Sequence, residues 1–155
     1  ANHAVIVTNY KKDFISLFLF LLPNSAETQQ NRGPSSRSVR SVFEKVFHEL
    51  GKMHGAGVRH GHPHFSNILV DKEGTKVAFT DPKFLGNVKE EPDLQAGFKH
   101  SEVFPSQGKG GDFDLNWLVH DIYFYGASHV PDWEKFISAY KKGVALGKKR
   151  TAHLA

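Results

Sequence analysis

The clearest periodic pattern in the chain lies between Val39 and His54. Apolar residues recur there at steps of three and four: Val39, Val42, Phe43, Val46, Phe47, Leu50 and Met53. This spacing puts them on one face of an α-helix. Gly55 and Gly57 follow, and glycine commonly ends a helix. The pattern therefore predicts an amphipathic helix over residues 39–54.

A second pattern, with the shorter period of strands, follows that helix. Residues 67–70 and 76–79 are short runs rich in apolar and β-branched residues. The turn Asp71-Lys72-Glu73-Gly74 lies between them, and such a turn between two short apolar runs indicates a β-hairpin. Asp81 comes directly after the second predicted strand.

Four further segments have patterns that predict regular structure. Residues 113–125 are apolar nearly all round, which is typical of a buried helix. The other three are a short strand over 4–8, a buried helix over 14–22 with Asp13 as its N-cap, and a last amphipathic helix beginning after Pro131 with Trp133, Phe136, Ile137, Tyr140 and Val144 on its apolar face.

The remaining segments are polar or irregular. We expect a flexible loop over about 23–38, an irregular loop over about 82–111 and a solvated basic tail over about 147–155. The whole pattern predicts one α+β domain over residues 1–155 that is mostly helical and carries a small β-hairpin.

Composition narrows the class of protein. The chain has 155 residues, a net charge of +4 and a hydrophobic content of 39%, which is typical of a globular protein. Lysine and arginine are not concentrated in a stripe, so the sequence does not indicate nucleic-acid binding. The absence of cysteine excludes disulfides and Cys-ligated zinc and is compatible with the cytoplasm. The longest apolar run, Phe14 to Leu22, is too short to span a membrane.

The order of helix, loop, hairpin and Asp81 resembles a known constellation. The segment from Met53 to His60 (MHGAGVRH) is similar to the "LHxxGxxH" sequence of kinase-like proteins, and His60 to Asn67 (HGHPHFSN) aligns with their H-x-D-x-x-x-x-N catalytic loop. The loop is most similar to the "HxDPHPGN" form of aminoglycoside-phosphotransferase-like and UbiB-like atypical kinases. Residues 4–126 therefore resemble the C-terminal lobe of a protein-kinase-like phosphotransferase.

The resemblance implies a set of functional residues. Asn67 and Asp81 occupy the positions that bind Mg²⁺ and, through it, ATP, and His62 occupies the position of the catalytic base. Asp114 occupies the position of an aspartate that braces the catalytic loop from a buried helix. His60 is expected to be a packed, hydrogen-bonded scaffold residue. The acceptor of the phosphoryl group is not specified by these motifs.

Three departures from the family pattern bear on activity. The catalytic aspartate is replaced by His62, the triplet after the hairpin reads Asp81-Pro82-Lys83, and no glycine-rich loop or strand-borne lysine of an N-terminal lobe precedes the matched region. A face normally covered by that lobe would then require a protein partner or a second copy of the chain.

These departures leave two alternatives to an atypical or degenerate phosphotransferase. One is a pseudokinase-like interaction scaffold without turnover. The other is a His-ligated metallohydrolase, since His60, His62 and His64 alternate and would share one face of an extended strand, with Asp81 completing a zinc site. Pro63 disfavours a regular strand at that position.

Overall fold

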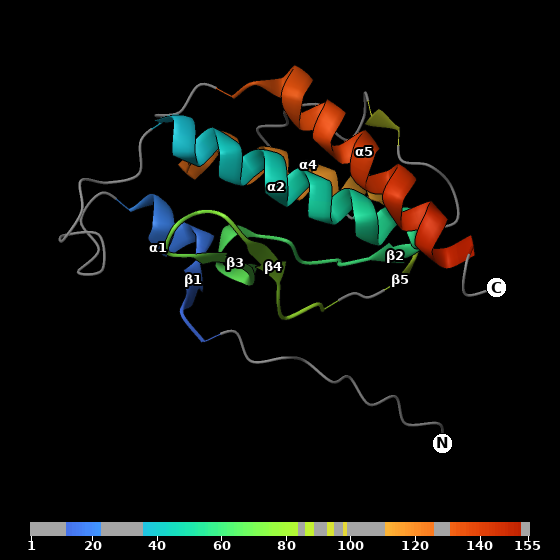
Figure 1. Cartoon of the computed structure of the whole chain (residues 1–155), viewed down its shortest axis with the longest axis horizontal. Coiled ribbons are helices and arrows are strands. Elements are labelled where there is room, and N and C mark those ends of the chain that lie inside the picture. The colour runs from blue at the N-terminus through green and yellow to red at the C-terminus, as the bar shows by residue number, and fades with distance from the viewer. Residues whose placement is uncertain are drawn as a thin grey trace.

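The computed structural model describes residues 12–22, 36–83, 86–88, 93–94, 98, 111–125 and 131–152. The predicted strand over 4–8, most of the predicted 23–38 loop and most of the 82–111 loop lie outside these residues. Long helices and small antiparallel sheets make up the described part, which is an α+β fold of mostly helical content. Figure 1 shows α2 (Ser36–Gly55) and α5 (Trp133–Ala152) side by side, with the short strands on the other side of α2.

The apolar run from Phe14 to Leu22 is not one helix, so that prediction was wrong. Residues 14–16 form strand β1 (Phe14–Ser16), and only Leu17–Leu21 form helix α1. Ser16 rather than Asp13 caps α1, because its hydroxyl accepts a hydrogen bond from the N–H of Leu19 (3.2 Å). Pairing of β1 with a strand far along the chain keeps the start of this apolar run extended.

Helix α2 confirms the periodic pattern and extends it to Ser36. The predicted apolar stripe lies inside, with Val39, Val42, Phe47 and Leu50 completely buried. The helix ends as expected at Gly55, and Gly57 follows with a φ of 80°, a conformation that glycine adopts without strain. The end of α2 and the turn that follows it are therefore set by Gly55 and Gly57, which the sequence had identified.

The predicted hairpin is also present. Strands β3 (Ile68–Asp71) and β4 (Val77–Phe79) are antiparallel, with Ile68 opposite Phe79 and Val70 opposite Val77. Asp71 organises the turn, since its Oδ1 accepts hydrogen bonds from the N–H groups of Thr75 (2.6 Å) and Lys76 (2.8 Å). Strand β1 pairs with the other edge of β3, which gives the strand order β1-β3-β4.

A second, smaller pairing was not predicted. Strand β2 (Val58–Arg59) follows α2 and pairs with β5 (Gly86–Asn87), which lies within the segment expected to be irregular. The pairing brings the chain after Asp81 back to the end of α2. It therefore joins the two ends of the segment that contains the candidate loop and the hairpin.

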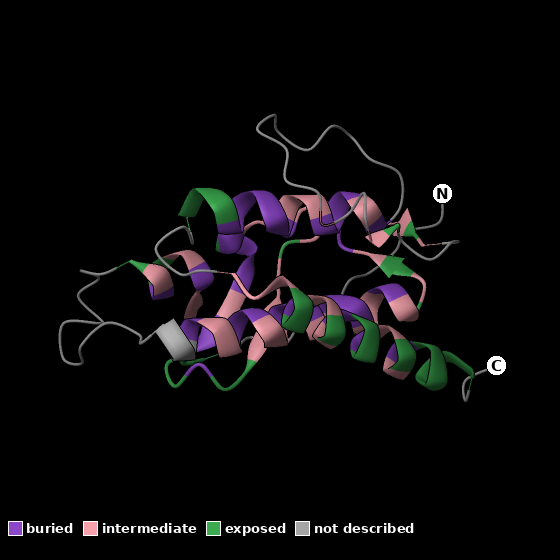
Figure 2. Cartoon of the chain, turned by 90° about the horizontal axis from the view of Figure 1, so that it is seen from above, coloured by how far each residue is buried: buried purple, intermediate pink, exposed green. Residues whose placement is uncertain are grey.

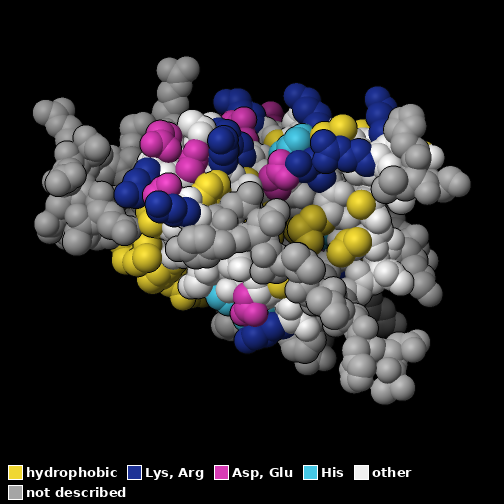
Figure 3. Space-filling model, turned by 60° about the horizontal axis from the view of Figure 1, so that its bottom comes forward, with side chains coloured by type: hydrophobic (Ala, Val, Ile, Leu, Met, Phe, Trp, Pro, Cys, Tyr) yellow, Lys and Arg dark blue, Asp and Glu magenta, His cyan; other side chains and the backbone are white. Residues whose placement is uncertain are grey.

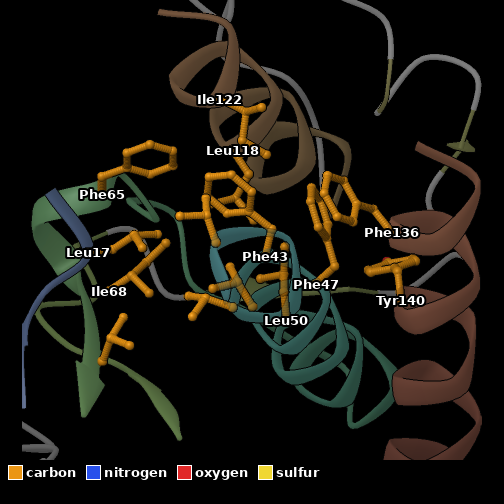
Figure 4. Packing of buried hydrophobic residues seen from close by; sticks show 14 of the residues in the cluster. Leu17, Phe43, Phe47, Leu50, Phe65, Ile68, Leu118, Ile122, Phe136 and Tyr140 are labelled. Carbon is orange, nitrogen blue, oxygen red and sulfur yellow. The ribbon is translucent and has the colours of Figure 1, made fainter. Parts of the chain in front are cut away.

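Helix α4 (Gly111–Tyr125) is the most buried helix, as its composition predicted. Its buried residues include Asp114, His120 and Asp121 as well as apolar side chains, whereas Tyr123, Phe124 and Tyr125 at its C-terminal end are exposed. Figure 4 shows side chains of α4, α5 and β3 converging on Phe43, Phe47 and Leu50 of α2. Helix α2 thus lies at the centre of the core.

Helices α2 and α5 approach each other at four glycines: Gly51 and Gly55 on α2, and Gly143 and Gly147 on α5. A Cβ atom at any of these positions would collide with a backbone carbonyl of the facing helix. The two helices therefore pack backbone against backbone, an arrangement that only residues without a side chain permit.

The C-terminal basic residues differ in part from the prediction. Residues 147–152 continue α5 rather than forming a tail, and Gly147 is buried against α2. Lys148, Lys149 and Arg150 are exposed, as expected, and Figure 2 shows the band of exposed residues that continues to this end of α5.

Large apolar side chains are exposed at several places in the described part: Leu19, Leu22, Val58, Tyr123, Phe124 and Tyr125. Figure 3 shows hydrophobic side chains gathered on the left, over α1. The ring of Phe18 in α1 contacts Tyr125 (centroids 5.5 Å apart), so this surface continues to the end of α4. Among the described residues, no helix has the length and hydropathy needed to cross a membrane.

Candidate functional site

The candidate site is built on the loop from His60 to Asn67, which joins β2 to β3. Gly61 has a φ of 79°, and the loop closes with a 3₁₀ turn over Phe65–Asn67 that continues directly into β3. Asn67 and Thr80 are linked across the hairpin, because the N–H of Thr80 donates to the carbonyl of Asn67 (2.9 Å). The end of the loop and the end of the hairpin are therefore held together.

Asp114 of α4 holds the start of the loop. Its carboxylate is fully buried and accepts hydrogen bonds from the N–H groups of His60 and Gly61, both at 2.8 Å. It also lies 2.9 Å from Nε2 of His54, whose other ring nitrogen lies 2.7 Å from the hydroxyl of Tyr140. This confirms the prediction that Asp114 points at the loop backbone.

Asp121 holds the other end of the loop, and this role was missed from the sequence. Its Oδ2 accepts a hydrogen bond from the N–H of Phe65 (2.9 Å), and burial raises the pKa of its carboxyl above the usual value. Asp114 and Asp121 are seven residues apart and so lie on the same face of α4. Two aspartates at that spacing in a largely buried helix are the signal that could have identified Asp121.

His60 is a scaffold residue, as expected. It is buried, its Nδ1 accepts a hydrogen bond from the N–H of His62 (3.1 Å), and its Nε2 donates to the carbonyl of Thr80 (3.0 Å). Burial lowers its pKa, although the nearby Asp114 carboxylate acts in the opposite direction. The ring of His60 therefore ties the loop to the end of β4.

His62 and Asn67 are in direct contact. The side-chain nitrogen of Asn67 lies 2.9 Å from Nδ1 of His62 and 3.0 Å from the carbonyl oxygen of the same residue. The His62 ring also packs against the rings of His64 (centroids 4.3 Å apart) and Trp117 of α4 (centroids 5.4 Å apart). Partial burial and the positive charge of Lys83 lower the pKa of His62.

Asp81 lies just beyond β4, is exposed, and has a φ of 50°. Positive φ is uncommon outside glycine, and residues in that region often belong to functional sites. The charge of Asp81 favours the protonated forms of His60, His62 and His64, and the preceding residue, Thr80, is hydrogen-bonded to Asn67 at the end of the loop. The fold thus places His62 and Asn67 in contact and brings the backbone beside Asp81 to the end of the same loop.

The donor atoms here suit a hard cation better than zinc. The side-chain nitrogen of Asn67 is engaged by His62, which leaves the amide oxygen as the atom that could bind a metal ion, and Asp81 offers an exposed carboxylate. Oxygen ligands of this kind fit Mg²⁺. Asn67 and Asp81 therefore offer the kinds of donor atom that the predicted Mg²⁺ would require.

The three alternating histidines do not form a zinc site. Both ring nitrogens of His60 are used within the scaffold, and its buried ring does not share a face with His62 and His64. In the part of the chain that the structure describes, no group of three or more His, Cys, Asp or Glu side chains is arranged to hold a metal ion. The geometry gives the metallohydrolase alternative no support.

A groove among the described residues lies away from this loop. It has a volume of about 860 Å³ and is formed by α2, α5 and the turn side of the hairpin, with Lys45, His48, Lys76 and Lys142 among its lining residues. Its walls contain both lysines and glutamates, and none of the candidate site residues lines it. The loop and the groove are therefore separate surfaces.

Comparison with known proteins adds no relative to this description. No family model, curated protein or solved structure matches the chain. The class of the protein therefore rests on its own fold: an α+β domain in which two buried aspartates of α4 hold a histidine-rich loop that continues into a β-hairpin.

Proposed function

We propose that this chain is an Mg²⁺-dependent ATP-binding domain of the kinase-like phosphotransferase class, resembling the C-terminal lobe of that fold. His62 replaces the catalytic base, so the domain is a degenerate member with little or no turnover of its own. The observation that carries the proposal is the double attachment of the His60–Asn67 loop to α4 by two buried aspartates.

Phosphoryl transfer depends on positioning, which explains why this loop attachment supports the proposal. Asp114 fixes the backbone on either side of the His60–Gly61 peptide bond, and Asp121 fixes Phe65. His62 and Asn67 lie on the stretch of loop bounded by these attachments. A loop that is held so closely to a buried helix presents its side chains in one geometry.

The candidate metal ligands come from two elements. Asn67 ends the loop and Asp81 follows β4, and the hydrogen bond from Thr80 to Asn67 joins the two (2.9 Å). When bound, Mg²⁺ would neutralise charge on the phosphate oxygens of the nucleotide. Asp81 is exposed and has a φ of 50°, so its carboxylate is accessible to a ligand at the end of the hairpin.

His62 is a poor replacement for a catalytic aspartate. It carries no negative charge, and the Asn67 amide occupies its Nδ1 atom (2.9 Å). A positioned base contributes about 10²–10⁴-fold to the rate of reactions that need proton transfer. Loss of that contribution favours nucleotide binding without efficient transfer.

Nucleotide binding can be tested by following the melting temperature with ATP, with and without Mg²⁺. We expect ATP to raise the melting temperature only when Mg²⁺ is present. Asp81→Asn should weaken Mg²⁺–ATP binding at least about tenfold, because Mg²⁺ affinity depends on the number of charged ligands. Asparagine also tolerates positive φ, so this change tests the charge rather than the backbone.

Glu73→Gln is the matched control, because it removes an exposed carboxylate from the turn at the other end of the same hairpin. It should leave binding unchanged. A thermal shift that is independent of Mg²⁺, or one that Asp81→Asn and Glu73→Gln affect equally, would contradict the proposed site. Absence of any nucleotide binding would favour the interaction-scaffold alternative.

Turnover is tested by comparing ATP consumption by the wild type and by His62→Asp. The aspartate restores an anionic acceptor beside Asn67, so its rate should exceed that of the wild type by roughly 10²-fold. A wild-type rate equal to or above that of His62→Asp would show that the domain is not degenerate.

A further inference from the structure

The ring nitrogens of the loop histidines are arranged in a consistent way. Each Nδ1 atom has a hydrogen-bond donor beside it. The N–H of His62 points to His60 (3.1 Å), the N–H of Ser66 points to His64 (3.2 Å), and the side-chain nitrogen of Asn67 points to His62 (2.9 Å). A neutral imidazole that accepts at Nδ1 carries its proton at Nε2.

The assignment is secure at His62 because a second contact orients the Asn67 amide. The same amide nitrogen lies 3.0 Å from the carbonyl oxygen of His62, and a carbonyl can only accept a hydrogen bond. The amide nitrogen must therefore face His62, and Nδ1 of His62 must be the acceptor. The lone pair that a general base would use is already occupied.

The protonated nitrogen of His62 is free to bind a ligand. At His60, Nε2 donates to the carbonyl of Thr80 (3.0 Å), but no residue in the described part of the chain accepts a hydrogen bond from Nε2 of His62. The ring is only partly buried, and its contacts with His64 and Trp117 fix its orientation. His62 therefore presents a positioned N–H donor.

The charges around this donor favour an anionic ligand that is bound to a metal cation over a free anion. Three charged groups act electrostatically on the His62 ring: Lys83 is positive, and Asp81 and Asp121 are negative. The negative charge of Asp81 would repel a free anion, whereas it would attract the metal ion of a metal-bound phosphate. The surroundings of His62 thus match a metal–phosphate ligand.

We propose that Nε2–H of His62 donates a hydrogen bond to a phosphate oxygen of the Mg²⁺-bound nucleotide. His62 is therefore a phosphate-binding residue rather than a proton acceptor. This inference rests on the proposed function and assigns a different role to the residue in the base position. It explains how a histidine at this position is compatible with nucleotide binding.

Two substitutions distinguish the role of Nε2 of His62 from the role of Nδ1. In His62→Gln, the amide nitrogen reaches the position of Nε2 and can still donate. In His62→Asn, the shorter amide can still accept from Asn67 but cannot reach the ligand. We expect Mg²⁺–ATP affinity to change by less than about threefold in the glutamine variant and to fall by roughly tenfold or more in the asparagine variant.

The tautomer itself can be measured by ¹⁵N NMR of the histidine rings in the intact chain. The His62 signals are identified by their loss in His62→Gln, and His48→Gln, on α2 outside the loop, serves as the control. Without ligand, Nε2 of His62 should be protonated. Addition of Mg²⁺ and a non-hydrolysable ATP analogue should shift that Nε2–H signal and leave His48 unchanged.

The outcomes distinguish this inference from the proposed function. An unprotonated Nε2 in the free protein, or equal affinities of the glutamine and asparagine variants, would overturn the phosphate-binding role while leaving nucleotide binding intact. If Mg²⁺–ATP fails to bind the wild type even though Nε2 is protonated, the proposed function is wrong and this inference fails with it.

Discussion

Asp114 shows how much one buried side chain determines in this protein. Its carboxylate is fully buried and lies within hydrogen-bond distance of two loop N–H groups and the ring of His54. A buried carboxylate is costly unless its oxygens are satisfied, and these contacts satisfy them. The residue therefore couples the stability of the core to the shape of the candidate site.

Asp114→Asn should destabilise the protein by about 3 kcal/mol. The amide can accept on only one of its two atoms, so its NH₂ group would face a loop N–H or the His54 ring and leave a buried donor unpaired. Urea denaturation monitored by circular dichroism would measure the change. The nucleotide-dependent thermal shift should be lost together with this stability.

Asp112→Asn is the matched control for Asp114, two residues earlier in the same helix. Burial raises the pKa of the Asp112 carboxyl, and no described residue hydrogen-bonds its Oδ1 atom. The amide resembles the protonated acid, so we expect a change within about 1 kcal/mol. Equal effects at the two positions would show that Asp114 has no special structural role.

At the scale of elements, the packing of α5 on α2 decides where Tyr140 and His54 meet. The glycines at positions 51, 55, 143 and 147 allow the backbones to approach closely, and Tyr140 of α5 then reaches His54 of α2 (2.7 Å). His54 in turn contacts Asp114 of α4 (2.9 Å). Three helices are thus linked by one buried hydrogen-bond chain.

Gly143→Ala tests this helix contact. Alanine normally stabilises a helix relative to glycine by about 1 kcal/mol. Here its Cβ would collide with the carbonyl oxygen of His48 and lie 3.0 Å from the carbonyl carbon of the same residue. We therefore expect a net loss of about 2 kcal/mol in the free energy of unfolding, since overpacking outweighs the helix propensity.

Ser138→Ala provides the comparison in the same helix, because Ser138 is exposed. Its effect should stay within about 0.5 kcal/mol. A stabilising Gly143→Ala would mean that α2 and α5 are farther apart in solution than their glycines allow.

At the scale of the whole molecule, the titratable groups inside the fold make its stability depend on pH. Burial lowers the pKa of His60, His62 and His64 below the usual value of 6.5. At pH values between 6.5 and the lower pKa values of the folded state, the unfolded chain binds more protons than the folded chain. Stability is therefore present above pH 6.5 and is lost as the pH falls through the lowered pKa values.

We predict that the free energy of unfolding decreases as the pH falls from 7 towards 5. Asp121 acts in the opposite direction, because burial raises its pKa and its folded form retains a proton that the unfolded chain releases above about pH 3.8. Asp121→Asn should therefore steepen the loss on acidification. Urea denaturation at a series of pH values would test both, and a flat wild-type profile between pH 7 and 5 would contradict the prediction.

The sequence by itself determined the elements whose patterns are local. The stripe of α2, the hairpin of β3 and β4 and the buried character of α4 follow from periodicity and turn residues, which act within a few positions along the chain. The loop from His60 to Asn67 was located by its motif. The contact of Asp114 with that loop was also predicted correctly, because the resemblance to kinase-like proteins implied it.

Only the tertiary structure decided the remaining features, because they depend on partners that are distant in the sequence. Strand β3 turned the start of the Phe14–Leu22 run into a strand, and β2 gave the segment after Asp81 a partner. Asp121 became an anchor because α4 lies against the loop. The proton position on His62 depends on the Asn67 amide, and the orientation of that amide is set by hydrogen-bond geometry that no spacing in the sequence reveals.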